Sequence, residues 1–296
     1  MAKLETAPPD SPVFIPPLPG WITTAPVESL EEAAFRSGAA LAHLHLVAGQ
    51  VIVPHALWRA RLALSAAELC AKIVGRRESV LELRDALYLL RPGDQPGPAG
   101  EMLRQWSRAV SRPILAAHLG KVLVGLPAEQ ITDYLKGKEG NPVDRAAGVL
   151  EAVLADAPRA EASALILADA ALAKALGWDH LLPFLSLALK PRDLRLRGDD
   201  LRLACHRAAV IGCGQAVTLA ADLARRAARL RTVVPQLRAK GAIRAVDLFL
   251  TQDALTPAAL TGLMSDRAAR RFCDRLVALE AVRELTGRDS FRLYGV

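Results

Sequence analysis

The chain has 296 residues, of which 52% are hydrophobic but only 4% aromatic, and its formal net charge is +7. Leu, Ala and Arg dominate and stretches rich in β-branched residues are few, so we expect helix almost throughout and exclude an extensive sheet. The charge suits a polyanionic partner, although an Arg-rich, GC-biased proteome produces the same bias without one.

The N-terminal residues 1–28 are rich in proline and have neither helical periodicity nor an apolar leader segment. This pattern predicts a surface arm, pinned to the body by Phe14 and Trp21. The uncharged stretch 37–58 is interrupted by three histidines, Gly49 and Pro54, so we expect a turn between two helices there and no membrane span. We therefore expect a cytoplasmic protein whose four cysteines are buried thiols without metal or redox spacing.

Residues 29–190 are predicted to form an α-helical domain. Ser29 is the expected N-cap of its first helix, with Glu32 completing a capping box. Apolar residues at helical spacing predict further helices, the last of them at 180–190. Residues 191–241 combine a charged break with a long basic helix from Leu201 to about Arg231, which Asp199 and Asp200 are expected to cap.

The most unusual stretch is LRPGDQPGPAG at 90–100. Its three prolines restrict the backbone, and its three glycines allow turns that other residues resist. Two interpretations stay open: a rigid loop that binds an anion or a partner, and an inter-helix elbow held by Arg–Asp hydrogen bonds. Both use the charged residues around it, Arg84, Asp85, Arg91 and Asp94. A phosphate-binding GxxxxGK[ST] motif is not present.

The C-terminal residues 242–296 carry the pattern of a winged helix-turn-helix. A first helix is predicted from Ile243 to Thr251, and Thr256 and Ser265 are expected N-caps of two further helices joined by a tight turn. In the last helix, Ala269, Phe272, Leu276 and Leu279 form one apolar stripe. Two short strands around Gly287 would then make a small β-hairpin, the wing. The predicted fold class is therefore all-α, with a C-terminal winged helix bearing this hairpin.

This unit supplies the candidate binding residues. A recognition helix needs one buried face and an opposite face that presents long donors to phosphates and base edges. We expect Arg267, Arg270 and Arg271 to act from the helix and Arg288 from the wing. Residues 265–296 hold seven arginines but also five acidic residues. An amphipathic helix and a hairpin used for packing or dimerisation are therefore the alternative.

Three segments carry a family resemblance: RLALSAAELCAKIVGR, LRDALYLLRPGDQPGPAG and LRLRGDDLRLACHRAAV, together with the C-terminal RELTGRDSFRLYG. From about Phe35 onward the chain resembles an alphaproteobacterial helical family known as domain of unknown function 1403. The resemblance implies a single bacterial architecture and no catalytic residue or cofactor. The association of such genomes with large plasmids is compatible with a role in replicon maintenance.

No catalytic constellation is evident in the sequence. His43 and His45 are two residues apart, and on a helix such side chains point about 200° apart, so one metal ion cannot take both. We therefore expect no enzyme activity, no metal site and no cofactor. The leading hypothesis is a regulatory or replicon-maintenance protein that binds double-stranded DNA. The alternative is a protein-interaction or scaffold protein whose winged helix forms a homodimer or a complex.

Overall fold

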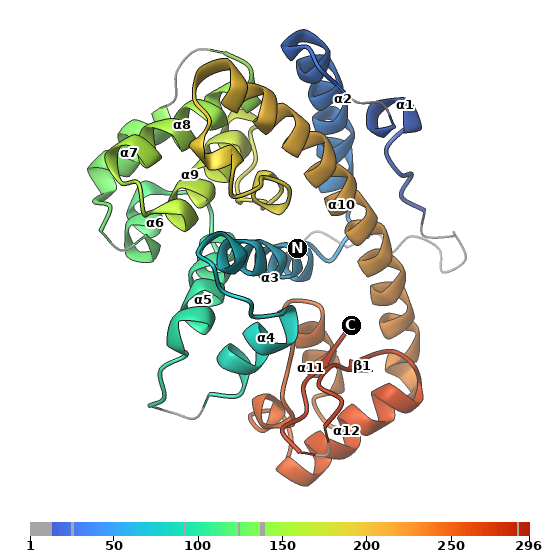
Figure 1. Ribbon diagram of the computed structural model, residues 1–296. Coiled ribbons are helices and arrows are strands. Elements are labelled where there is room, and N and C mark those ends of the chain that lie inside the picture. Colours follow the sequence, from blue (N-terminus) through green and yellow to red (C-terminus); the bar gives the residue numbers. More distant parts are fainter. Residues whose placement is uncertain (1–13, 25–26, 91–92, 124, 137–139, 289) are drawn as a thin grey trace.

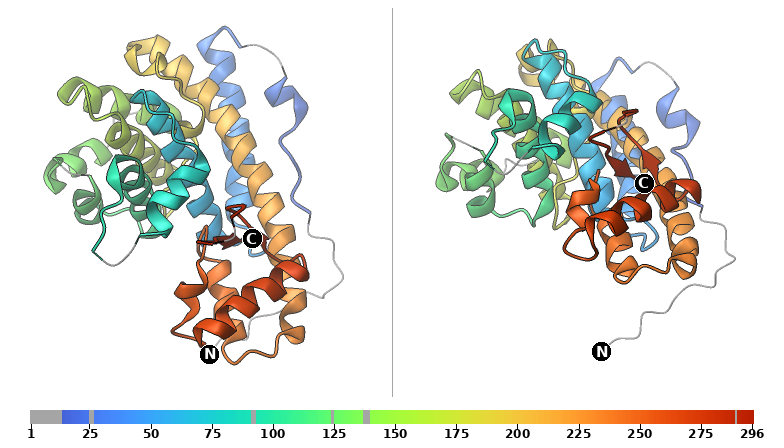
Figure 2. Two further views of the ribbon diagram at one scale, coloured as in Figure 1. Left: turned by 60° about the horizontal axis from the view of Figure 1, so that its bottom comes forward. Right: turned by 90° about the horizontal axis from the view of Figure 1, so that it is seen from below.

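The computed structural model describes residues 14–24, 27–90, 93–123, 125–136, 140–288 and 290–296. Helices dominate this part of the chain, which confirms the all-α class, and they are arranged along one long helix, α10 (Gly198–Val233). Figure 1 shows α10 running from the upper body to the C-terminal elements at the bottom. In the views of Figure 2, α2 lies beside the upper part of α10.

The body is built from nine helices that precede α10 within the described residues. They are α1 (Gly20–Thr23), α2 (Leu30–Ala48), α3 (His55–Ile73), α4 (Val80–Tyr88), α5 (Gly97–Ser111), α6 (Ala116–Val122), α7 (Ala128–Lys136), α8 (Pro142–Asp156) and α9 (Glu161–Ala175). Two 3-10 turns, η1 (Leu185–Leu187) and η2 (Asp193–Arg195), lead into α10. The prediction of a helix at 180–190 is therefore wrong, because this segment is mostly irregular and contains a single 3-10 turn.

The C-terminal unit follows α10 after a further 3-10 turn, η3 (Val234–Gln236). Its elements are α11 (Ala242–Phe249), η4 (Pro257–Leu260), α12 (Asp266–Ala278), β1 (Arg283–Glu284) and β2 (Tyr294–Gly295). The buried side chains form one contiguous apolar cluster that extends from Ile15 to Val296. The core thus runs without a break from the body into this unit.

Small residues on one face of α10 explain how closely the body packs against it. Ala209, Gly212, Ala216 and Ala220 recur at helical spacing and are all buried. At Gly212, a Cβ atom would overlap the Phe184 carbonyl oxygen and lie 2.7 Å from its carbon, so glycine alone allows this approach. The segment 198–236 is long and apolar enough to span a membrane, but half of its apolar window is buried inside the protein.

A buried carboxylate organises the segment that contacts Gly212. Asp169 of α9 is fully buried and accepts hydrogen bonds from the backbone N–H groups of Leu185 (3.0 Å) and Ser186 (3.3 Å), and from the Ser186 hydroxyl (2.7 Å). Burial raises the pKa of Asp169 to about 7, although these hydrogen bonds act in the opposite direction. An irregular segment thereby obtains the backbone hydrogen-bond partners that a helix would have supplied.

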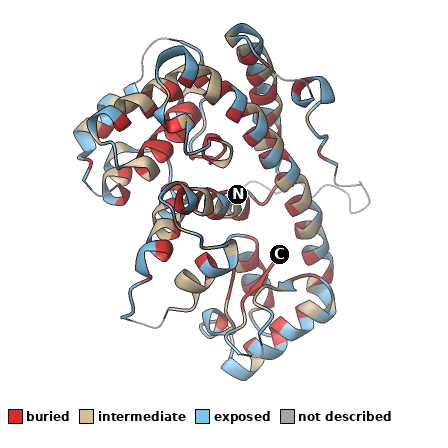
Figure 3. Cartoon of the chain, viewed as in Figure 1, coloured by how far each residue is buried: buried red, intermediate tan, exposed pale blue. Residues whose placement is uncertain are grey.

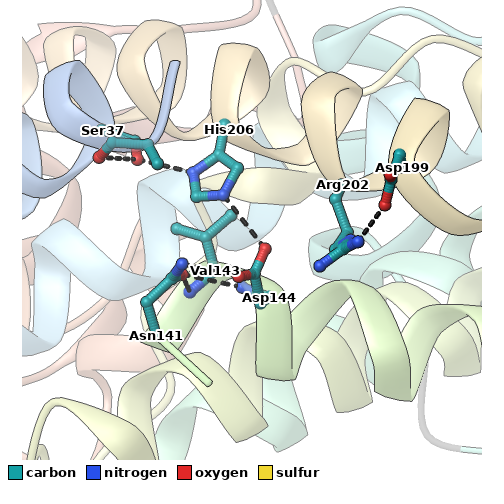
Figure 4. Close-up of polar contacts among 8 residues, drawn as sticks. Ser37, Asn141, Val143, Asp144, Asp199, Arg202 and His206 are labelled. Atoms are coloured by element: carbon teal, nitrogen blue, oxygen red, sulfur yellow. Dashed lines mark hydrogen bonds and ion pairs between the residues drawn. The ribbon is translucent and has the colours of Figure 1, made fainter. Parts of the chain in front are cut away.

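A second buried polar contact joins three helices. His206 of α10 lies between Ser37 of α2, whose Oγ is 2.7 Å from Nδ1, and Asp144 of α8, whose Oδ1 is 3.1 Å from Nε2 (Figure 4). Because a carboxylate can only accept, Nε2 carries the proton. The Ser37 hydroxyl then lies between two acceptors, Nδ1 and, at 3.0 Å, the Ala34 carbonyl oxygen. Ser37 and His206 are each only 1% exposed. Despite its Ser–His–Asp composition, this trio is closed to a substrate and acts as an inter-helix contact.

The structure tests the predicted caps at the N-terminal ends of two helices, α2 and α10. Ser29 accepts from the Glu32 N–H as predicted, but the full capping box is found at Ser79 and Glu82. The prediction that Asp199 and Asp200 cap α10 is wrong, because the helix already begins at Gly198 and both lie in its first turn.

The arm residues Phe14 and Trp21 are also placed differently from the prediction. Phe14 is exposed, and the buried residues of this segment are Ile15 and Ile22. Trp21 is half-exposed and contacts the Phe35 ring. Residues 1–13 and 25–26 of the predicted arm lie outside the described residues.

Candidate nucleic-acid interface

The helix α12 forms where its sequence predicts it. Ser265 accepts a hydrogen bond from the Ala268 N–H (3.4 Å) and thereby caps the helix. Ala269, Phe272 and Leu276 are buried as expected, and Leu279 is half-buried just after the helix. The preceding predicted helix is shorter than expected, because η4 is a single 3-10 turn capped by Thr256.

The C-terminal hairpin is small and partly irregular. Arg283 pairs with Gly295 and Glu284 with Tyr294, in antiparallel register. Gly287 adopts φ +63° at the turn, where the Glu284 carboxylate accepts from its N–H at 2.8 Å. Residues 291–294 do not alternate between two faces as they would if the strand predicted after Gly287 were regular. Phe291 has φ +55° and is 64% exposed, whereas Leu293 and Tyr294 are both buried, because the paired strand begins only at Tyr294.

A basic groove lies along one side of α12. It has a volume of about 800 Å³ between α12 and the segment 235–239. Its cationic side chains are Arg238, Arg267, Arg271 and Arg275, and all four are exposed. The last three recur every four residues and therefore follow one face of α12 at about 6 Å intervals. We call this feature the arginine groove; Figure 3 shows the exposed outer surface of α12.

The electrostatics of the arginine groove are one-sided. None of the described residues that line it is acidic. In the described part of the chain, its four arginines form no ion pair with a carboxylate. Four exposed guanidinium groups in a lining that holds no acidic residue produce a positive potential that attracts anions.

Two of the predicted binding arginines lie elsewhere. Arg270 is on α12 but outside the groove, where its guanidinium pairs with Asp266 at 3.1 Å. Arg288 of the hairpin pairs with Asp85 of α4, which holds the hairpin turn against the body. Of the predicted set, the structure thus brings together Arg267 and Arg271.

The basic residues of α10 also fail to extend the groove. Arg225 and Arg226 both pair with Asp222, and Arg229 pairs with Glu280 of the C-terminal unit at 2.6 Å. Asp222 and Glu280 thus offset part of the charge of these three arginines. The cationic side chain that residues 201–250 contribute to the groove is Arg238.

A buried ionic cluster fixes the C-terminal unit to the body. Asp253, 2% exposed, receives two hydrogen bonds from the Arg84 guanidinium, at 2.7 and 2.8 Å, and forms an ion pair with Arg61. Arg61 also donates to the carbonyl oxygens of Asp253 (3.2 Å) and Val296 (2.9 Å). Burial lowers the pKa of Arg84, but its hydrogen bonds to Asp253 and the charge of that carboxylate raise it by more. At Arg61 burial lowers the pKa, and the charge of Asp253 opposes that shift.

The structure describes three of the four charged residues around the loop at 90–100. Arg84 and Asp85 contact the C-terminal unit through Asp253 and Arg288, as described above. Arg91 lies outside the described residues, and Asp94 is at the turn itself. The backbone is shaped by Gly97, with φ +64°, and by Gly100, where a Cβ would lie 2.8 Å from the Ala86 carbonyl oxygen of α4.

The sequence analysis did not identify Arg238 and Arg275 of the groove, or Asp253, which fixes the C-terminal unit to the body. Arg275 follows Arg271 by four residues, so the helical period alone could have added it to the set. Arg238 comes from a segment beyond Pro235 whose position depends on the fold. Asp253 has no local sequence signature, because both of its partners lie about 170 or more residues away.

The comparisons with known proteins agree with the resemblance noted in the sequence. No curated protein matches the chain. A family model described as "Protein of unknown function (DUF1403)" matches residues 10–296, nearly the whole length. The chain therefore belongs to the DUF1403 family.

Proposed function

We propose that the protein binds double-stranded DNA through the arginine groove. The observation that carries this proposal is the unpaired set Arg267, Arg271 and Arg275 on one face of α12, with Arg238 on the opposite wall. Guanidinium groups donate several hydrogen bonds in a fixed plane, which suits phosphate oxygens and the acceptor edge of guanine. Three turns of helix with such a face have the dimensions to enter a major groove about 12 Å wide.

We further infer that the C-terminal unit is a winged helix. Its support is the order of elements: α11, an extended residue Leu255, η4, α12 and then the hairpin. Leu255 and Tyr294 exchange backbone hydrogen bonds of 2.9 Å, so that β2 lies between Leu255 and β1. In this reading α12 is the recognition helix. The hairpin differs from a DNA-contacting wing, since Arg288 is engaged by Asp85.

The test is a pair of double variants with equal changes in net charge. Each arginine that neutralises a phosphate releases a counterion, which adds about 0.9 to the slope of log affinity against log salt. Replacing Arg267 and Arg271 by Gln should weaken duplex retention at least tenfold and flatten the slope by about 1.8. The control is Arg270→Gln with Arg288→Gln, two arginines outside the groove, which should leave the slope nearly unchanged.

Three results would contradict the proposal: no retention of the unmodified protein on any duplex at ~50 mM salt, an unchanged slope in the groove variant, or equal effects of the two double variants. The first would favour a protein-interaction role for the C-terminal unit. Regulation or replicon maintenance is the corresponding cellular role, which chromatin immunoprecipitation in the source bacterium would test by the loci recovered.

A further inference from the structure

A second cavity lies in the body, away from the arginine groove. It has a volume of about 360 Å³ and is bounded by the end of α2, the start of α3 and the segment 177–182. It shares no lining residue with the arginine groove. Such a volume falls within the range of small-molecule sites.

The walls of this cavity are aromatic and held in place. The Trp178 indole N–H donates to His45 Nδ1 at 2.9 Å, and the two rings are stacked. Trp58 is 1% exposed, and its indole N–H donates to the Ala216 carbonyl of α10 at 2.9 Å. Both indole N–H groups are thus satisfied within the protein. The partly exposed Trp178 ring is left as an apolar wall, and the buried Trp58 supports the floor behind it.

Arg59 provides a charge in this cavity. Its Nε donates to the Val110 carbonyl oxygen at 3.1 Å, which anchors the half-buried side chain. Within the described ranges, Arg59 forms no ion pair with a carboxylate. A partly desolvated guanidinium without a counter-ion is costly, and an anionic ligand would remove that cost.

Two imidazoles and one carboxylate complete the polar lining. Burial lowers the pKa of His55 and of His180, and the charge of Arg59 lowers both further. Asp179 also lines the cavity, but its charge affects the pKa of His180 less than that of Arg59 does. The histidines of this region do not form a metal site: in the described residues no group of three or more His, Cys, Asp or Glu could hold a metal ion.

We propose that this cavity binds a small organic anion with a planar apolar body, the carboxylate or phosphate at Arg59 and the body against the partly exposed Trp178 ring. A planar body gains contact with this indole, and the charged end receives charge-assisted hydrogen bonds from a guanidinium that forms no ion pair within the described residues. The neutral imidazole of His180 supplies a further hydrogen bond to the ligand.

The probes are benzoate and its neutral counterpart of similar shape, benzyl alcohol, titrated by calorimetry and by tryptophan fluorescence. Benzoate should bind in the micromolar to millimolar range, at least tenfold more tightly than benzyl alcohol, because only the anion pairs with Arg59. Inorganic phosphate should bind more weakly than benzoate, since it lacks the apolar body.

Variants of the lining residues test whether benzoate binds in this cavity. Arg59→Gln should weaken benzoate at least tenfold and abolish the preference for it over benzyl alcohol. Arg104→Gln, a half-buried arginine paired with Glu101 outside the cavity, should leave the affinity unchanged. If Arg59→Gln does not fold, as judged by circular dichroism, His180→Ala serves in its place and should weaken benzoate severalfold. No binding of benzoate up to ~10 mM, equal binding of the two probes, or unchanged affinity in the folded cavity variant would overturn the proposal.

Discussion

Replacing Asp253 by Asn is the sharpest test of how the C-terminal unit is held. The substitution keeps the shape of the side chain but removes the charge that Arg84 and Arg61 share. Breaking a buried ion pair on one side costs about 3–5 kcal/mol, because the remaining charge is left uncompensated. The lower end applies here, since Arg61 keeps its hydrogen bonds to the carbonyl oxygens of Asp253 and Val296. We therefore expect the free energy of unfolding to fall by about 3 kcal/mol.

Urea unfolding followed by circular dichroism measures this loss. With a denaturant slope of about 3 kcal/mol/M, the midpoint should move down by about 1 M. Asp85→Asn is the matched control, because it breaks the neighbouring, more exposed pair with Arg288. There we expect a loss of less than about 1 kcal/mol. If the two variants lose equal stability, or if Asp253→Asn costs less than about 1 kcal/mol, the buried cluster does not fix this unit.

Two further predictions concern α10 and its contact segment. Gly212→Ala should lower the free energy of unfolding by about 3 kcal/mol, because the added Cβ would overlap a backbone oxygen. Gly214→Ala is the control: its Cβ would meet only Leu18 at 3.6 Å, so in the same denaturation experiment it should be neutral or slightly stabilising. The raised pKa of Asp169, about 7 against about 4 in an unfolded chain, means that its contribution to stability is fully present below pH 4 and is lost as the pH rises to about 7. This component, up to about 1.4 kcal/mol per pH unit, should be missing from the pH profile of Asp169→Asn; superimposable slopes between pH 4 and 7 for the two proteins would contradict it.

Helices with local start and stop signals were predictable from the sequence. Asn141 and Pro142 place the beginning of α8 correctly, because an Asn side chain satisfies the first N–H groups and a proline needs none. The turn between Gly49 and Pro54 was likewise predictable. The segment 180–190 was not, because Asp169 accepts from its backbone N–H groups and Gly212 makes room for its Phe184 carbonyl, and both of these residues lie outside the segment. Apolar spacing cannot distinguish that arrangement from a helix.

The candidate site was predictable in part for a similar reason. The buried stripe of α12 indicates which face is exposed, and Arg267 and Arg271 lie on that face. The spacing of four residues between Asp266 and Arg270 is that of an ion pair within one helix, so this pairing could have been predicted. Spacing could not show that Arg288 would meet Asp85, because that contact depends on how the hairpin is docked against the body.

Because α10 is one continuous helix, its length in residues relates the orientation of the C-terminal unit to that of the body. This one helix packs against α2 and α8 near its start and contacts Glu280 through Arg229 near its end. Each residue of a helix turns the chain by about 100° and advances it by about 1.5 Å. Inserting a single residue between Val217 and Arg229 would therefore turn the end of α10 by more than a quarter of a turn, which the ion pairs of Asp253 with the body would oppose. The residue count of α10 thus has to match the docking of the C-terminal unit, and with it the direction in which the arginine groove faces.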